Sequence, residues 1–248
     1  MKPLFIVDID SNLGQSKRNC PAGEELTVMS VGMDDKPNTF MTPSQLAFFN
    51  WISASGHVVP CTARHSDGVV GRMRIPFTHH AIVSFGGAIL LPDHSAEPVW
   101  NDFVQGQAKE SGPILTAILA EIEKEAQAEG ITIKSVIKNE FGSDIFMEMK
   151  YRGEDSSALD YIDELMTSLA PQGWQRHRND DTLALLPPWL GKEKAAEYYV
   201  KHIAEPALFV VGMGDSLTDL PFMQSACGYA MMPVNSQAFS TIMTEVKI

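Results

Sequence analysis

With 248 residues, 44% of them hydrophobic and 20% charged, the chain can bury the core of one large α/β domain, or of a core domain with a second module inserted into it. Its net charge of −12 disfavours nucleic acid and anionic membranes as partners and suits a divalent cation. Three widely spaced cysteines without a CxxC pair, and an apolar N-terminal run of only four residues, argue against disulfides, zinc sites and a secretion signal, so we expect a cytoplasmic protein.

The first element is a short apolar run, residues 3–7, which predicts a buried parallel strand. Asp8 and Asp10 follow it at the carboxyl end, where open α/β sheets bind ligands. One carboxylate there could attack a phosphorus atom, while the other protonates the leaving oxygen and later deprotonates water. Taken alone, the pair is more simply explained as capping the next turn, and only the rest of the chain favours catalysis.

Five further elements are expected before residue 87: a β-hairpin over 26–42, a helix over 43–56, a strand over 57–61, a short helix over 66–74 and a third core strand over 81–85. The first helix has clear start signals, because Thr42 suits its N-cap and Pro43 its first position. Thr62, after the second strand, suits either a phosphoryl oxygen or the cap of the next helix. The paired Gly86 and Gly87 allow a tight exit from the third strand.

The pattern changes between residues 88 and 187, where short strands and two helices indicate an α+β module with an antiparallel sheet. Its expected elements are strands over 89–91, 98–100, 131–138, 145–151, 174–178 and 182–186, and helices over 111–129 and 156–169. We therefore predict that residues 88–187 form a domain inserted into a core of residues 1–87 and 188–248.

Alternating order then returns, with a helix over 191–203, a strand over 207–211, a helix ending at 223, a strand over 228–232 and a last helix starting at 235–237. Asp215 and Asp219 follow the strand, so acids again come after a strand end. In a parallel sheet such ends share one edge, where carboxylates repel one another unless a cation joins them. Their hard oxygen atoms suit Mg²⁺, and Lys192, at the start of a helix, could supply positive charge to the nucleophile and the phosphoryl group.

Four stretches, in this order, resemble the motifs of the haloacid dehalogenase (HAD) superfamily of phosphatases. Residues 8–12, D-I-D-S-N, are similar to its DxDx[TV] motif, residues 58–62 to the second motif, Lys192 to the third and residues 212–219 to GDxxxD. The inserted module resembles the type IIB cap of Cof-like and sucrose-phosphatase-like members.

Two signatures of those members are also similar to stretches of this chain. T-A-R at residues 62–64 is similar to their T-[GA]-R signature. K-E-K-A-A at 192–196 is similar to K-G-x-A-L, with Glu193 in place of the glycine, so Lys194 is a second candidate for the lysine role.

The resemblance implies an α/β fold, with a Rossmann-like parallel-sheet core and an inserted α+β cap, and a Mg²⁺-dependent phosphatase that forms an aspartyl phosphate. It implies Asp8 as nucleophile and Asp10 as general acid and base, with Thr62 and Lys192 holding the phosphoryl group. The implied Mg²⁺ ligands are the Asp8 carboxylate, the Asp10 backbone carbonyl and Asp215, with Asp219 supporting the site directly or through water. Asn12 replaces the usual Thr or Val, which leaves an altered activity open.

The expected substrate is a small phosphorylated metabolite, preferably a phosphosugar, which the cap would select. Candidate cap contacts, for which a solvated surface position is the more common role, are Lys134, Lys138, Arg152, Arg176 and Arg178. Candidate core contacts, with turn, ion-pair and cap roles as alternatives, are Ala63, Arg64, Gly86, Gly87 and Asn235. The rival functions are a phosphotransferase of the phosphomutase type and a non-catalytic phospho-ligand binding protein. We expect a monomer or a small homo-oligomer.

Overall fold

The computed structural model describes residues 1–179 and 181–245 and divides into two compact units. Met1–Glu97 and the chain from Lys192 onward form the core domain, and Pro98–Gly191 form the inserted domain. The predicted boundaries at 88 and 187 thus move to 98 and 191. The first boundary moves because β7 (Ala88–Leu90) pairs with β6 (Ala81–Val83) and so belongs to the core domain.

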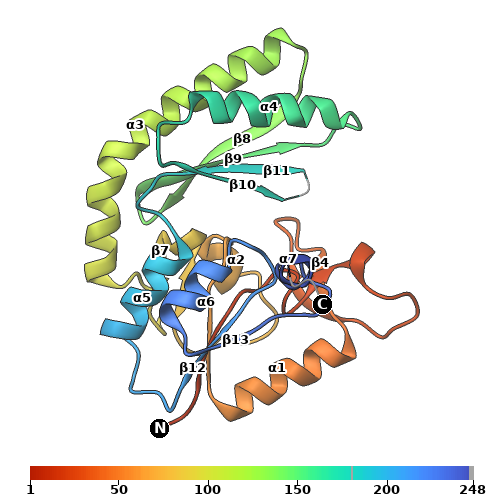
Figure 1. Cartoon of the computed structure of the whole chain (residues 1–248), viewed down its shortest axis with the longest axis vertical. Coiled ribbons are helices and arrows are strands. Elements are labelled where there is room, and N and C mark those ends of the chain that lie inside the picture. Colours follow the sequence, from red (N-terminus) through yellow and green to blue (C-terminus); the bar gives the residue numbers. More distant parts are fainter. Residues whose placement is uncertain (180, 246–248) are drawn as a thin grey trace. The chain divides into compact units, whose positions relative to one another are not determined.

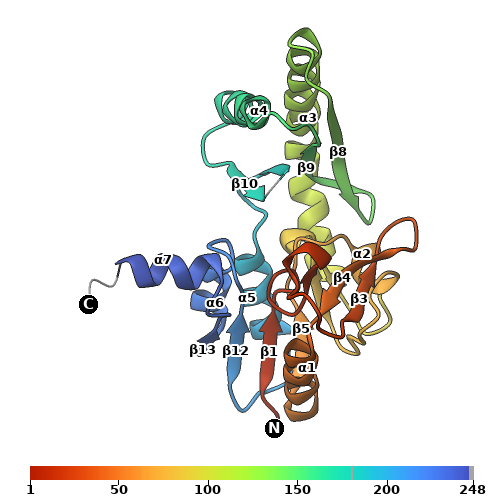
Figure 2. The same ribbon diagram turned by 90° about the vertical axis from the view of Figure 1, so that its right-hand side faces the viewer.

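The core domain is built on a parallel sheet of four strands in the order β13-β12-β1-β5, which Figure 2 shows side by side. These strands are β1 (Leu4–Val7), β5 (His57–Pro60), β12 (Val210–Met213) and β13 (Tyr229–Met231). The continuous apolar run of β1 is completely buried, as expected for a strand with neighbours on both sides. The helices of this domain are α1 (Pro43–Ser55), α2 (Ser66–Val70), α5 (Lys192–His202), α6 (Leu220–Ala226) and α7 (Gln237–Glu245). The predicted α/β class is confirmed.

The start of α1 follows its sequence signals. The Thr42 hydroxyl accepts the backbone N–H of Gln45 at 3.2 Å, and the Gln45 side chain accepts the backbone N–H of Thr42 at 2.9 Å. This reciprocal capping satisfies two N–H groups that the helix itself leaves without partners.

Four core elements differ from their predicted bounds by two residues or more, and one of them is α6, which ends at Ala226 and not at residue 223. The helix α2 ends at Val70, earlier than the predicted residue 74. The strand β12 begins at Val210, later than the predicted residue 207. The strand β6 stops at Val83, because Ser84 and Phe85 adopt left-handed backbone angles (φ 52° and 57°) in a short 3-10 turn. This turn, and not the glycine pair alone, ends the strand.

The predicted hairpin is formed by β3 (Thr27–Val31) and β4 (Pro37–Met41), and β2 (Gln15–Ser16) adds an unpredicted third strand to it. We call residues 27–41 the flap. Ser30 and Thr39 are paired across the two strands, and their buried hydroxyl groups are hydrogen-bonded to each other. The flap therefore places two hydroxyl groups together inside the core domain.

The inserted domain has an antiparallel sheet of four strands in the order β10-β11-β9-β8. Its strands are β8 (Ile133–Glu140), β9 (Ser143–Tyr151), β10 (Gln175–Asn179) and β11 (Thr182–Leu186), and its helices are α3 (Pro98–Ala128) and α4 (Ser156–Leu169). Both helices pack on one face of the sheet, over buried residues such as Met147 and Leu183 (Figure 1). The predicted α+β module is thus present.

The long helix α3 corrects one prediction. We expected a strand over 98–100 and a helix starting at Ser111, but α3 runs from Pro98 without a break and contains Pro113. A proline inside a helix removes one backbone hydrogen bond and bends the helix, and Figure 1 shows α3 bent. The Ser111 hydroxyl accepts the indole N–H of Trp189 at 3.1 Å and donates to the Gln107 carbonyl at 3.2 Å, which fixes this part of α3.

None of the helices in residues 1–179 and 181–245 combines the length and the apolar character needed to cross a membrane.

Candidate active site

Polar side chains from three strand ends meet at one edge of the core sheet. The register pairs Val7 at the end of β1 with Pro60 of β5 and Met213 of β12. The segments that follow these three strands therefore leave the sheet side by side. Asp8, Asp215 and Asp219 follow β1 and β12, and one carboxylate oxygen from each lies within 4.8 Å of the others. The structure therefore brings together the three acids that the sequence placed at strand ends.

Lys192, the first residue of α5, joins two of these acids. Its Nζ lies 2.7 Å from Asp8 Oδ1 and 2.7 Å from Asp219 Oδ1, and its side chain is 5% exposed. Burial alone would lower the pKa of Lys192, but the two carboxylates outweigh it and hold the pKa above its usual range. Lys194, the second candidate, has its Nζ 3.8 Å from Glu193. Lys192 is thus the lysine at the acids.

The acids at this edge are crowded. Burial raises the pKa of Asp8, the nearby Asp219 and Asp10 raise it further, and Lys192 opposes them. Burial and the charge of Asp219 raise the pKa of Asp215 to about 6. A divalent cation between Asp8 and Asp215 would remove this electrostatic cost.

The carboxylate of Asp219 has little capacity left for a metal. Its Oδ1 accepts Lys192, and its Oδ2 accepts the backbone N–H groups of Asp215 (3.2 Å) and Ser216 (3.0 Å) and the Ser216 hydroxyl (2.7 Å). Burial alone would raise the pKa of Asp219, but the Lys192 and Ser216 contacts lower it. Asp219 therefore orients Lys192 and the loop after β12, and Asp8 and Asp215 are the carboxylates better placed to bind a metal.

Gly214 allows this arrangement. A Cβ atom at this position would overlap the Asp219 side chain, with only 2.7 Å to its Cγ. A glycine is therefore required where the loop passes the carboxylate.

Asp10 has a partner that the sequence did not indicate. The Arg64 side chain donates from Nε to Asp10 Oδ2 at 2.7 Å and from Nη2 to Asp10 Oδ1 at 2.6 Å. Arg64 also donates to the hydroxyl groups of Ser30 (3.0 Å) and Thr39 (3.4 Å) in the flap, neither of which was a predicted site residue. The flap strands, T-V-M-S-V and P-N-T-F-M, have no regular alternation that could have marked these two residues.

Asn12 and Thr62, the last residues of the first and second motifs, each have a hydrogen-bond partner in the backbone. The Asn12 side chain, which is buried, donates to the Asp8 backbone carbonyl at 2.9 Å and so holds the turn after β1. The Thr62 hydroxyl accepts the backbone N–H of Arg64 at 3.1 Å, while His65 caps α2. The Thr62 hydroxyl proton is thus available to a ligand.

No family model and no curated protein sequence matches the chain. Solved structures do resemble it. The sucrose-phosphatase from Synechocystis sp., in complex with sucrose and phosphate, has a TM-score of 0.56 at 15% identity over 99% of this chain and 88% of that one. The C-terminal domain of C. albicans trehalose-6-phosphate phosphatase has a TM-score of 0.55 at 14% identity over 90% and 73%. A haloacid dehalogenase-like hydrolase from Bacteroides thetaiotaomicron has a TM-score of 0.53 at 13% identity over 99% and 100%.

The chain has a haloacid dehalogenase-like fold. In this fold the core sheet and an inserted domain are both present, as the resemblance of the motifs implied. The motif residues lie at strand ends of the haloacid dehalogenase-like core domain, apart from Lys192, which is the first residue of α5.

The remaining predicted contacts of the haloacid dehalogenase-like core are Ala63, Gly86, Gly87 and Asn235. Gly86 is buried, and the preceding Phe85 donates its backbone N–H to the Thr62 carbonyl at 3.0 Å. Asn235 is exposed, and the cap of α7 comes from Ser236, whose hydroxyl accepts the Phe239 N–H at 3.1 Å. In the sequence, Ala63 follows Thr62 and Gly87 follows Gly86.

The basic residues of the inserted domain are partly engaged by acids of the same domain. Arg176 and Arg178 each bind Asp163 of α4, at 3.4 Å and 3.1 Å, and Lys138 binds Glu148 at 3.1 Å. Lys134 and Arg152 are exposed. A substrate contact from any of them stays a prediction.

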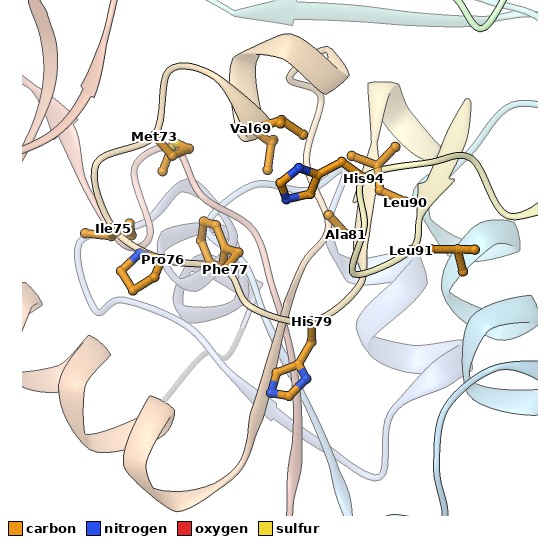
Figure 3. A pocket seen from close by; sticks show the side chains of 11 residues that line it. Val69, Met73, Ile75, Pro76, Phe77, His79, Ala81, Leu90, Leu91 and His94 are labelled. Atoms are coloured by element: carbon orange, nitrogen blue, oxygen red, sulfur yellow. The ribbon is translucent and has the colours of Figure 1, made fainter.

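A separate cavity of about 200 Å³ lies between α2, β6, β7 and the loop over residues 71–80 (Figure 3). Its lining is apolar apart from two histidines, and Figure 3 shows the His94 ring among Val69, Ala81 and Leu90. It shares no lining residue with the acid cluster and offers no carboxylate to a metal. The acid cluster is therefore the candidate active site.

Proposed function

We propose that the chain is a Mg²⁺-dependent phosphatase that hydrolyses a small phosphorylated metabolite, preferably a phosphosugar, through an aspartyl phosphate. The observation that carries this proposal is the buried Asp8 carboxylate at the end of β1, paired with Lys192 and adjacent to Asp215. The phosphosugar preference is supported by the fold, since similar structures include a sucrose-phosphatase and a trehalose-6-phosphate phosphatase.

In the first step, Asp8 attacks phosphorus while the bond from phosphorus to the leaving oxygen breaks. Asp8 Oδ1 is bound by Lys192, so Oδ2 is the attacking atom. Asp10 gives its proton to the leaving oxygen, which departs as an alcohol and leaves the phosphoryl group on Asp8. Lys192 and the Thr62 hydroxyl balance the charge on the phosphoryl oxygens.

In the second step, Asp10 accepts a proton from a water molecule as the water oxygen attacks phosphorus. The bond between phosphorus and Asp8 breaks, which releases inorganic phosphate and restores the Asp8 carboxylate. The Asp10 carboxyl group then carries the proton that the next leaving oxygen requires.

The donors at the site fit Mg²⁺, which prefers hard oxygen ligands and keeps several waters. Asp8, Asp215 and the backbone carbonyl of Asp10 would hold it, with Asp219 orienting the loop that carries Asp215. When bound, Mg²⁺ supplies positive charge to the phosphoryl oxygens.

Phosphate release from a panel of phosphorylated sugars, acids and nucleotides, with Mg²⁺ and with chelator, tests the proposal. Asp8→Asn should lower release by at least about 10³-fold. The same change at Asp93, an exposed aspartate, is the matched control and should leave release unchanged. Full turnover by Asp8→Asn would exclude Asp8 as the nucleophile.

Two outcomes separate the rival functions. Oxygen from labelled water should enter the released phosphate in a hydrolase, whereas a phosphotransferase would move the phosphoryl group to another acceptor. Saturable binding of phosphorylated compounds without turnover in Mg²⁺ would instead identify a binding protein.

A further inference from the structure

The carboxylate of Asp10 is held in one orientation by Arg64. Two parallel hydrogen bonds, 2.7 Å from Nε and 2.6 Å from Nη2, join the guanidinium to both carboxylate oxygens. Such a two-pronged pair fixes the plane of a carboxylate, which a single contact does not. The Asp10 side chain is 45% exposed, so packing alone would leave its terminal torsion free.

Arg64 is in turn held by the flap. Its Nη1 donates to Ser30 Oγ at 3.0 Å and contacts Met73 Sδ at 3.6 Å, and its Nη2 lies 3.4 Å from Thr39 Oγ1. Ser30 is 0% exposed and Thr39 is 7% exposed, and their hydroxyl groups bind each other. The guanidinium therefore has partners on its flap side as well as on its Asp10 side.

This arrangement differs from an ordinary surface ion pair. An exposed pair contributes little to stability and leaves both side chains mobile. The Arg64 side chain is only 16% exposed, and a hydrogen-bonded pair of buried hydroxyl groups lies against it. Arg64 is thus held in place and can fix the orientation of the Asp10 carboxylate.

We propose that Arg64 is a positioning residue for Asp10, and that Ser30 and Thr39 of the flap act on Asp10 through Arg64. This inference rests on the proposed phosphatase function, in which Asp10 protonates the leaving oxygen. An acid must lie within hydrogen-bond reach of the oxygen that it protonates, and a displacement of about 1 Å costs on the order of 10²-fold in rate. Losing Arg64 should therefore impair proton donation specifically.

The demand for that proton depends on the leaving group. A sugar alkoxide leaves poorly without a proton, whereas p-nitrophenolate leaves readily without one. The value of kcat/KM reports on the steps up to formation of the aspartyl phosphate, where Asp10 acts as acid. The ratio of kcat/KM for a sugar phosphate to that for p-nitrophenyl phosphate therefore measures how well Asp10 is positioned.

The experiment measures this ratio, with the best sugar phosphate of the panel, in the wild type and in Arg64→Ala, Arg64→Lys, Ser30→Ala and Thr39→Val. Arg64→Ala should lower the sugar phosphate value by about 10²-fold and the p-nitrophenyl phosphate value by about 3-fold or less. Arg64→Lys should recover part of the ratio, because lysine keeps the charge but not the two-pronged geometry.

The flap variants test the second half of the proposal. Ser30→Ala and Thr39→Val should lower the ratio by a few fold in the wild type and by nothing further in Arg64→Ala, because residues acting through one another are not additive. Arg74→Ala is the matched control. Arg74 is an exposed arginine of the same region whose side chain binds the Gly71 and Met73 carbonyls, so the ratio should stay at the wild-type value.

Equal losses with both substrates in Arg64→Ala and Arg64→Lys would overturn the positioning role, since a purely structural defect does not distinguish leaving groups. Additive losses from the flap variants in Arg64→Ala would overturn the route through Arg64. A wild type that cleaves neither ester would remove the proposed function and this inference with it. A wild type that cleaves both, with an unchanged ratio in the variants, would remove only the inference.

Discussion

Replacing Lys192 by methionine measures how strongly the site depends on its buried cation. Lys192 binds Asp8 and Asp219 at 2.7 Å each, and the three side chains are 5%, 8% and 1% exposed. Methionine has a similar length but no charge, so the change leaves two buried carboxylates without a counter-charge. Breaking a buried pair from one side costs about 3–5 kcal/mol, and we expect a loss of this size in metal-free protein.

Urea unfolding in the presence of a chelator measures this loss. The free energy of unfolding should fall by about 3–5 kcal/mol with little change in the slope against urea, and the melting temperature by on the order of 10 °C. Asp8→Asn in the Lys192→Met background should restore part of the stability, with a coupling energy of about 1–3 kcal/mol, because an amide needs no counter-charge. Replacing the chelator by Mg²⁺ should also restore stability, since a ligand of the native state stabilises it.

Lys194→Met is the control for the same chemical change two residues away. The Lys194 side chain is 39% exposed, and its Nζ lies 3.8 Å from Glu193 Oε1, which is a long distance for an ion pair. The free energy of unfolding should therefore change by less than about 0.5 kcal/mol. A Lys192→Met loss no larger than that of Lys194→Met would refute the reasoning. So would the absence of any recovery on adding Asp8→Asn.

Three further changes test other parts of the core domain. Gly214→Ala pushes a methyl group against Asp219, so phosphate release should fall by about 10-fold or more while the far-UV circular dichroism spectrum is kept. Burial and the nearby His57, whose Nδ1 lies 2.9 Å from His79 Nε2, lower the pKa of His79 below its usual 6.5. The unfolded chain then binds more protons, so the melting temperature should fall as the pH drops below about 6.5, and His79→Asn should flatten that dependence. Asn12→Ala removes a buried hydrogen bond, and urea unfolding should show a loss of about 1 kcal/mol.

The fold was predicted best where one local signal dominates. The bounds of α4 and β11 agree with the prediction residue by residue, because each is a periodic run with clear breaks at both ends. The long helix α3 was predicted to start at Ser111 because Gly112 and Pro113 resemble a helix start. In the fold, Trp189, which is 78 positions away, donates a hydrogen bond to the Ser111 hydroxyl inside this helix. No local pattern carries such a contact.

The same limit applies to the site, where the identities of the acids were predictable but their roles were not. Parallel strands end at one edge of a sheet, so the sequence could place Asp215 and Asp219 together. Whether a carboxylate oxygen can bind a metal depends on its side-chain partners, and the Asp219 oxygens accept hydrogen bonds from Lys192 and Ser216. Asp10 likewise meets Arg64 across 54 positions of sequence. Short motifs therefore specify which groups reach the sheet edge, and the contacts around them decide which group binds a metal and which one orients another.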